Sequence, residues 1–330
     1  MFTPLATHDE SGAPLAAPVN ARRAAGAAYT PRTLDTLRIK DARLRDALEG
    51  TGHLLFDGGM GSMLQEAGMK AGALPELLNL ENPQMIVGIQ RQYVEAGCNV
   101  ITANTFGANA HKLDGAANVS DVFRAAVACA REAGARYVAG DIGPIGALLR
   151  PLGTLSFDEA YDLFAEEVRA AVAAGVDLFV IETMTDLAEI KAAVLAAKEN
   201  SDLPIFATMT FEEDGRTFLG TNPEIAAITL DAIGADVVGI NCSQGPAELR
   251  GLARRMLAVT DKPVMVQANA GLPHVDDDGN TVYDIHPAEY AAAVEGMIGD
   301  GVGIVGGCCG TTPAHMAELK RLIDGHAPVP

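Results

Sequence analysis

Two adjacent cysteines and a third one earlier in the chain form the pattern with the clearest chemical meaning. Cys308 and Cys309 follow an apolar, β-branched run and two glycines, and Pro313 can open the helix that comes next. Adjacent cysteines seldom pair with each other, because the ring would be strained. At the end of a strand they are typical of thiolate ligands, and Cys242 supplies a third sulfur. Three thiolates leave the fourth position of a tetrahedral zinc ion open, as in catalytic zinc sites.

An open position on such a zinc ion can take the thiol of a substrate. The thiol would bind as a thiolate and stay nucleophilic at neutral pH, which suits attack on a methyl group. The alternative is that the cysteines are small buried residues that pack the top of the fold. Neighbouring residues of a strand point to opposite faces, so Cys308 and Cys309 share one site only at a distorted strand end. We expect Gly306, Gly307 and Gly310 to give the backbone that freedom.

Two acidic residues are candidates for binding the ammonium group of a substrate. Asp57 follows a short apolar run, and the glycines after it, beginning with Gly58, let backbone amides approach a ligand. The alternative role of Asp57 is to cap the next helix. Glu182 follows the apolar run 178–181, where a carboxylate is costly to bury unless it is paired. Together, Asp57 and Glu182 are suited to hold the α-ammonium group of an amino acid.

Several uncharged polar residues also stand directly after apolar runs. They are Asn104, Thr105, Asn241 and Asn269. These side chains either orient a substrate or tie loops together, and Asn269 is also a candidate oxygen ligand when substrate is absent. Asp141, beside a Gly-Pro pair, is expected to tie loops together.

A regular alternation of strands and helices must position these residues. Eight apolar, β-rich runs occur at 54–56, 100–103, 137–139, 178–181, 205–209, 237–240, 264–267 and 302–305. Each is followed by a segment of helical length, at 83–96, 121–134, 157–174, 186–200, 223–233, 246–259, 287–298 and 313–323. Eight such units predict a (β/α)8 TIM barrel, with an open doubly wound sheet as the rival architecture. Barrel active sites lie at the C-terminal ends of the strands, which is where the candidate residues fall.

The two parts of the chain are expected to differ in order. Residues 1–50 are interpreted as an N-terminal extension, partly flexible, with one helix over 33–48 that Thr33 caps. Residues 51–330 are assigned to the barrel, which is a usual length for this fold.

Composition narrows the class of protein. The formal net charge of −19 disfavours nucleic acid and anionic membranes as partners. No apolar run approaches the roughly 20 residues that a membrane helix needs. An odd number of cysteines without a secretory signal predicts a reducing, cytoplasmic location. Cys98 and Cys129 lie away from the strand ends and are expected to be structural.

Five short motifs stand at the ends of the expected strands. They are Asp57-Gly58-Gly59-Met60-Gly61, Asn104-Thr105-Phe106, Glu182-Thr183, Gly239-Ile240-Asn241-Cys242 and Gly306-Gly307-Cys308-Cys309-Gly310. With them, the chain resembles the homocysteine S-methyltransferase family over about residues 52–324. This family includes enzymes that use betaine or S-methylmethionine and the homocysteine-binding module of cobalamin-dependent methionine synthase. The chain looks most similar to that module.

The resemblance implies a TIM barrel that transfers a methyl group to the thiol of L-homocysteine and forms methionine. It implies zinc on Cys242, Cys308 and Cys309, with the amino group of homocysteine near Asp57 and Glu182. The expected donor is a methylated corrinoid protein that carries methylcobalamin, because residues 51–330 leave no room for a corrinoid domain. An onium compound of the S-methylmethionine or betaine type is the alternative donor.

Two other functions stay open at this point. The glycines and the helix after the last strand can cradle a phosphate, as in many barrels, although no Lys or Arg stands at a strand end. The chain can also be a non-catalytic module that binds a thiol substrate and presents it to a partner.

Overall fold

The structure is a computed structural model that describes residues 33–70, 72–275 and 281–325. The part of the expected extension before residue 33 lies outside these residues. The chain divides into two compact units, Met1–Thr33 and Leu34–Pro330. The description below concerns the second unit.

Eight parallel strands form one sheet in the order β1-β10-β7-β6-β5-β4-β3-β2. Their bounds are β1 (Leu54–Leu55), β2 (Val100–Thr102), β3 (Tyr137–Ile142), β4 (Leu178–Met184), β5 (Ile205–Met209), β6 (Val237–Cys242), β7 (Val264–Ala268) and β10 (Ile304–Gly307). A parallel bridge between Phe56 and Val100 joins β1 to β2, and the Asp57 amide donates to the Val100 carbonyl at 3.2 Å. The predicted TIM barrel is therefore confirmed.

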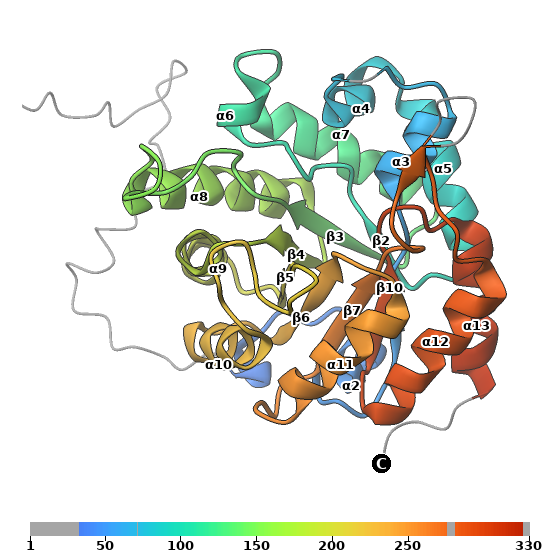
Figure 1. Cartoon of the computed structure of the whole chain (residues 1–330). Helices are drawn as coiled ribbons and strands as arrows, with labels where there is room; N and C mark the ends of the chain where they lie inside the picture. The colour runs from blue at the N-terminus through green and yellow to red at the C-terminus, as the bar shows by residue number, and fades with distance from the viewer. Residues whose placement is uncertain (1–32, 71, 276–280, 326–330) are drawn as a thin grey trace, which may run out of the picture. The chain divides into compact units, whose positions relative to one another are not determined.

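A long helix follows each strand, and Figure 1 shows these helices arranged around the central strands. They are α5 (Pro83–Glu95), α7 (Val119–Glu132), α8 (Phe157–Ala174), α9 (Leu187–Asn200), α10 (Pro223–Ile233), α11 (Pro246–Leu257), α12 (Pro287–Asp300) and α13 (Pro313–Gly325). Several begin at a proline, as predicted, and α8 begins with a capping box in which Ser156 and Glu159 bond each other's backbone amides. Between the strands and these helices lies the larger of two apolar clusters, which includes Cys98 and Cys129.

Shorter elements lie mostly in the loops that follow the strands. They are α3 (Met60–Glu66), η2 (Pro75–Leu77), α4 (Leu78–Glu81), α6 (Ala110–Leu113) and the antiparallel pair β8 (His274–Val275) and β9 (Thr281–Val282). No helix in the described ranges is both long and apolar enough to cross a membrane.

The segment before the barrel differs from the prediction of one helix over 33–48. The structure has a 3-10 turn, η1 (Leu34–Thr36), and then a separate helix, α2 (Ala42–Leu48). Asp41, and not Thr33, caps α2, because its Oδ1 accepts from the Leu44 amide at 3.1 Å. Between the two elements the Arg38 amide bonds the Asp202 carbonyl at 2.8 Å, which holds the chain extended.

Helix α2 closes the N-terminal end of the barrel, called the floor here. Its buried face packs against side chains of the barrel interior and forms the second apolar cluster with them. Inside this cluster the rings of Phe56 and Phe206 lie 5.7 Å apart. The compact unit that contains the barrel accordingly begins at Leu34. The assignment of residues 51–330 to the barrel itself stays a prediction.

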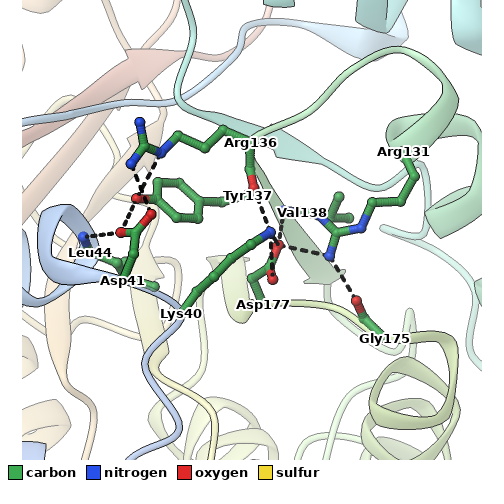
Figure 2. Close-up of polar contacts among 9 residues, drawn as sticks. All are labelled: Lys40, Asp41, Leu44, Arg131, Arg136, Tyr137, Val138, Gly175 and Asp177. Atoms are coloured by element: carbon green, nitrogen blue, oxygen red, sulfur yellow. Dashed lines mark hydrogen bonds and ion pairs between the residues drawn. The ribbon is translucent and has the colours of Figure 1, made fainter.

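Ion pairs fasten the segment before α2 to the floor (Figure 2). Asp41 accepts a hydrogen bond from the Tyr137 hydroxyl at 2.5 Å and pairs with Arg136 at 2.8 Å. Lys40 pairs with Asp177 at 3.1 Å and also donates to the Arg136 carbonyl at 2.7 Å. Partial burial acts to raise the pKa of Asp41, but the bonds from Tyr137 and Arg136 outweigh it and lower the pKa to about 2.

Candidate metal and substrate site

The structure brings the three predicted sulfur ligands together at the C-terminal end of the strands, called the mouth here. Cys242 is the last residue of β6, and Cys308 and Cys309 follow β10. Their Sγ atoms all lie within 4.8 Å of one another, and those of Cys242 and Cys309 are 3.9 Å apart. Within the described ranges this is the one group of three or more Cys, His, Asp or Glu side chains close enough to hold a metal ion.

Residues next to the cysteines adopt rare backbone conformations that let the three sulfur atoms approach one another. Cys242 and Ser243 adopt left-handed conformations, with φ of 60° and 68°, which non-glycine residues seldom adopt. Gly310 has a φ of 76°, as the turn after Cys309 requires. Gly307 has a different role from the expected one: a Cβ there would lie 2.1 Å from Oγ1 of Thr311, so the glycine allows close approach.

The sulfur geometry fits a zinc ion. Tetrahedral coordination with Zn–S bonds of about 2.3 Å places neighbouring sulfurs about 3.8 Å apart. Hydrogen bonds from Cys242 and Cys308 lower the pKa of Cys309 to about 3, while hydrogen bonds and burial raise that of Cys308. The cluster therefore already stabilises a thiolate at neutral pH, which is the form that binds metal.

Asp57 lies beside this cluster with only 3% of its surface exposed. Its two oxygens accept from the backbone amide of Thr102 at 2.8 Å and from the Thr102 hydroxyl at 2.7 Å. Burial raises the pKa of Asp57 to about 6, although the Thr102 bonds oppose this. A buried carboxyl with a raised pKa is poised to pair with a cation that enters the site.

Glu182 is the second predicted carboxylate, and it lies within β4. Burial and the negative charge of Cys242 raise its pKa to about 7. Asp141, in β3, lines the same cavity as Glu182, and burial and the charge of that neighbouring carboxyl raise the pKa of Asp141 well above its ordinary value. Two neighbouring carboxyl groups seldom both ionise, so this pair holds a proton until a cation arrives.

These groups face a common cavity of about 270 Å³. Its lining includes all three cysteines together with Asp57, Asp141 and Glu182. Among the described residues that line it, none is a lysine or an arginine. The site therefore offers sulfur ligands and acidic groups without an opposing positive charge, which favours a substrate that brings its own cation.

Comparison with known proteins places this site in a family. The profile described as "Homocysteine S-methyltransferase" matches residues 54–323. The chain belongs to the homocysteine S-methyltransferase family. Membership places it among methyltransferase enzymes.

Two curated relatives are methionine synthases. That of Mycobacterium tuberculosis is 36% identical over 293 residues, and that of Mycobacterium leprae is 33% identical over 302 residues. The matches cover 82% and 83% of this chain but only 24% and 25% of those proteins. The chain thus spans about a quarter of the length of these relatives.

A solved structure has the same fold. The metallated form of the homocysteine methyltransferase MmuM from Escherichia coli superposes with a TM-score of 0.72, over 85% of this chain and 99% of that one. At 23% identity, this likeness concerns the architecture.

For this member of the homocysteine S-methyltransferase family, the predicted substrate contacts divide into two groups. Asp57, Gly58, Asn104 and Glu182 line the cavity. Thr105, Asn241 and Asn269 are buried, but they are not among the residues that line it. The Thr105 hydroxyl donates to the Asp141 carbonyl at 2.8 Å and so ties the loop after β2 to strand β3. Asn269 is buried with its Oδ1 unpaired among the described atoms.

Both the oxygen and the nitrogen of the Asn241 side chain form hydrogen bonds with other groups of the protein. Its oxygen accepts from the Thr183 amide at 2.8 Å and the Thr208 hydroxyl at 2.7 Å. Its nitrogen donates to Glu182 Oε2 and to the Thr183 hydroxyl, both at 2.7 Å. These bonds hold Thr183 at a φ of 60°, a strained value for a β-branched residue, and they orient Glu182.

Sequence reasoning missed two residues that contribute to the site. Asp141 faces the cavity, because β3 continues to Ile142 and carries it inward, whereas we expected it to tie loops together. Thr102, which anchors Asp57, is the last residue of β2. The sequence signal that could have identified Thr102 is its position two residues before the motif that begins at Asn104.

Proposed function

We propose that the protein catalyses zinc-dependent transfer of a methyl group to the thiol of L-homocysteine, with methionine as the product. The observation that carries this proposal is that three cysteine sulfurs share one cavity with three carboxyl groups whose pKa values are raised, those of Asp57, Asp141 and Glu182. The sulfurs suit a metal that binds a thiol, and the carboxyl groups suit the ammonium group of an amino acid. Family membership supports the same substrate.

Cys242, Cys308 and Cys309 are the residues that would hold the zinc ion. When bound, zinc keeps the substrate sulfur deprotonated and nucleophilic at neutral pH. The left-handed backbone at Cys242 and the turn at Gly310 direct the sulfurs toward a common point before any ligand arrives.

The carboxyl groups bind and orient the amino acid. Asp57 is fixed by Thr102, and Glu182 is fixed by Asn241, so neither must reorganise when the ammonium group arrives. An ammonium group stabilises the ionised form of both carboxyl groups, so the proton held between Asp141 and Glu182 leaves as substrate binds. The sulfur then attacks the methyl group in line, and the bond between the methyl group and the donor atom breaks, with its electron pair leaving on the donor. No further acid or base from the protein is needed, since the donor is already activated.

We propose a methylated corrinoid protein as the donor. Support comes from the resemblance to the homocysteine-binding module of cobalamin-dependent methionine synthase and from the methionine synthases to which the chain is similar. The cavity has no lysine or arginine among its described lining residues, which argues against the alternative of a phosphate-binding barrel.

Metal analysis of cysteine variants tests the zinc site. We expect the purified protein to hold about one zinc ion per chain, as a three-cysteine catalytic site does. Cys308→Ala should lose both the zinc and the turnover. Cys129→Ala is the matched control, because Cys129 is buried in α7 away from the site and should keep both. Full zinc content and turnover in Cys308→Ala would contradict the proposal.

A panel of methyl donors tests the reaction. The protein would be assayed for methionine with homocysteine and, in turn, free methylcobalamin, a methylated corrinoid protein, S-methylmethionine and betaine. Turnover with the corrinoid donors supports the proposal. Turnover with an onium compound alone would identify that compound as the methyl donor in place of the corrinoid protein. Zinc and homocysteine binding without turnover from any donor would make the chain a substrate-binding module.

A further inference from the structure

Two hydroxyl groups join the loop after β1 to the turn between β10 and α13. Thr311, in the turn, accepts a hydrogen bond from the Gly59 amide at 3.1 Å and donates to the Cys308 carbonyl at 2.7 Å. Ser62, in α3, makes the reverse connection: its hydroxyl accepts from the Gly310 amide at 3.2 Å and donates to the Gly59 carbonyl at 3.1 Å. Each hydroxyl therefore bonds both segments, and we call the pair the hydroxyl clasp.

The side chain of Thr311 fits between two glycines. A Cβ on Gly58 would lie 2.6 Å from Oγ1 of Thr311, and a Cβ on Gly307 would lie 2.1 Å from the same atom. From α5, the Tyr93 hydroxyl donates to the Thr311 carbonyl at 3.0 Å. Both Thr311 and Tyr93 are fully buried. The close packing prevents the two segments from moving nearer to each other, and the hydrogen bonds prevent them from moving apart.

These two segments carry groups that would hold opposite ends of a thiol amino acid. Asp57 directly precedes Gly58, and its carbonyl accepts from the Gly307 amide at 2.9 Å. Cys308 and Cys309 directly follow Gly307. A substrate with its sulfur at the cysteines and its ammonium group at Asp57 must span a separation that the protein fixes. The length of the carbon chain between sulfur and ammonium then decides whether both ends fit.

We propose that Thr311 and Ser62 are positioning residues that set the separation between the sulfur cluster and Asp57, and that this separation selects homocysteine over cysteine. This inference rests on the metal and substrate site proposed above. Cysteine is shorter by one methylene group, and a methylene group that only fills an apolar pocket is worth about 10- to 200-fold in selectivity. Between two fixed anchors, the shorter chain must also give up one of its two contacts, so a small difference in length becomes the loss of an interaction.

The test measures how tightly three thiols bind to the zinc-loaded protein, by isothermal titration calorimetry without a methyl donor. The thiols are L-homocysteine, L-cysteine and 2-mercaptoethanol, which has no ammonium group. We expect the wild type to bind homocysteine about 100-fold more tightly than cysteine. Thr311→Val keeps the shape of the side chain and removes its hydroxyl, so this ratio should fall about tenfold. The affinity for 2-mercaptoethanol should not change, because this thiol does not use the carboxyl groups.

Three further variants complete the test. Thr311→Ser restores the hydroxyl and should return the ratio to the wild-type value. Ser62→Ala removes the other half of the clasp and should lower the ratio as Thr311→Val does, and it carries the test alone if Thr311→Val does not fold. The matched control is Thr260→Val, between α11 and β7 at the floor. The Thr260 hydroxyl accepts from the Lys262 amide at 3.1 Å and donates to Asp231 at 3.3 Å, and its loss should not affect any of the three thiols.

The outcomes separate this inference from the proposed function. If the wild type binds no zinc, or binds zinc but not homocysteine, the proposed function is wrong. If the wild type binds homocysteine and cysteine equally, or if Thr311→Val and Ser62→Ala keep the wild-type ratio, the proposed function stands and the role of the clasp is overturned. Weaker binding of 2-mercaptoethanol to Thr311→Val would also overturn it, because the hydroxyl would then support the metal and not the separation.

Discussion

The two ends of the barrel treat charge in opposite ways. At the floor, Asp41 and Asp177 are matched by Arg136 and Lys40, and the pKa of Asp41 falls to about 2. At the mouth, the pKa of Asp57 rises to about 6, and no described lysine or arginine lines the cavity. The floor gains stability from its charges, whereas the mouth keeps buried carboxyl groups in need of a partner. Such unsatisfied groups are typical of sites that await a ligand.

The largest effect should come from neutralising a carboxyl group at the mouth. Glu182→Gln keeps the size of the side chain and can still accept from Asn241, but it cannot pair with an ammonium group. We expect the loss of this buried charge pair to cost about 3 kcal/mol, or about 100-fold in kcat/KM for homocysteine. Steady-state assays at pH 7 measure it.

The same variant should not lose stability. A neutral side chain is less costly to bury than a carboxylate, so the free energy of unfolding of the metal-free Glu182→Gln protein should equal or exceed that of the wild type. Urea denaturation measures this. A decrease above about 1 kcal/mol would show that Glu182 supports the fold and would remove the contrast between the two ends.

At the floor we expect a smaller effect, which lowers stability and leaves activity unchanged. Asp41→Ala removes the cap of α2 and the partner of Tyr137 and Arg136, so the free energy of unfolding should fall by about 2 kcal/mol. The value of kcat/KM should not change, because the change lies at the far end of the barrel. Asp35→Ala is the control, since Asp35 is an exposed acidic residue of the same segment. It should stay within about 0.5 kcal/mol of the wild type.

Acid should affect the two ends in opposite directions. The pKa of Asp57 is raised from 3.8 to about 6 in the folded protein, so its burial costs stability at pH 7 and this cost disappears as the pH falls toward 4. The pKa of Asp41 is lowered from 3.8 to about 2, so its contribution is complete above pH 4 and is lost between pH 4 and pH 2. The change in stability over each of these two pH ranges can be measured in the metal-free protein.

Unfolding free energies at several pH values provide this measurement. The difference between the wild type and Asp57→Asn should change by about 3 kcal/mol between pH 7 and pH 4, in favour of the wild type at the lower pH. The difference between the wild type and Asp41→Ala should stay constant over that range and shrink below pH 4. Parallel curves for all three proteins would mean that neither carboxyl group has the perturbed pKa described above.

Much of the barrel could be predicted from local patterns. The eight apolar runs and the prolines at helix starts are properties of short segments, and these segments alone decide where strands and helices form. The sulfur cluster could be predicted because parallel strands in a barrel end at the same face, so Cys242 and the pair at 308 and 309 had to approach each other.

The remaining features depend on contacts between distant segments. The split of the predicted helix over 33–48 follows from the fit of α2 to the barrel interior, and no residue within 33–48 encodes the position of Tyr137. The role of Asn241 in orienting Glu182 requires the left-handed turn at Thr183. The ring of Tyr283 packs on Gly310, and Ala270 links their two segments by backbone hydrogen bonds. Each of these arrangements joins residues that are far apart in sequence.

The closed floor also bears on the order of events during turnover. Helix α2 and the packed rings of Phe56 and Phe206 block one end, so every molecule enters and leaves the site through the mouth. Homocysteine, which must reach the sulfurs and the buried carboxyl groups, has to be seated before a methyl donor covers the opening. We therefore expect ordered kinetics, in which homocysteine binds first and methionine departs last.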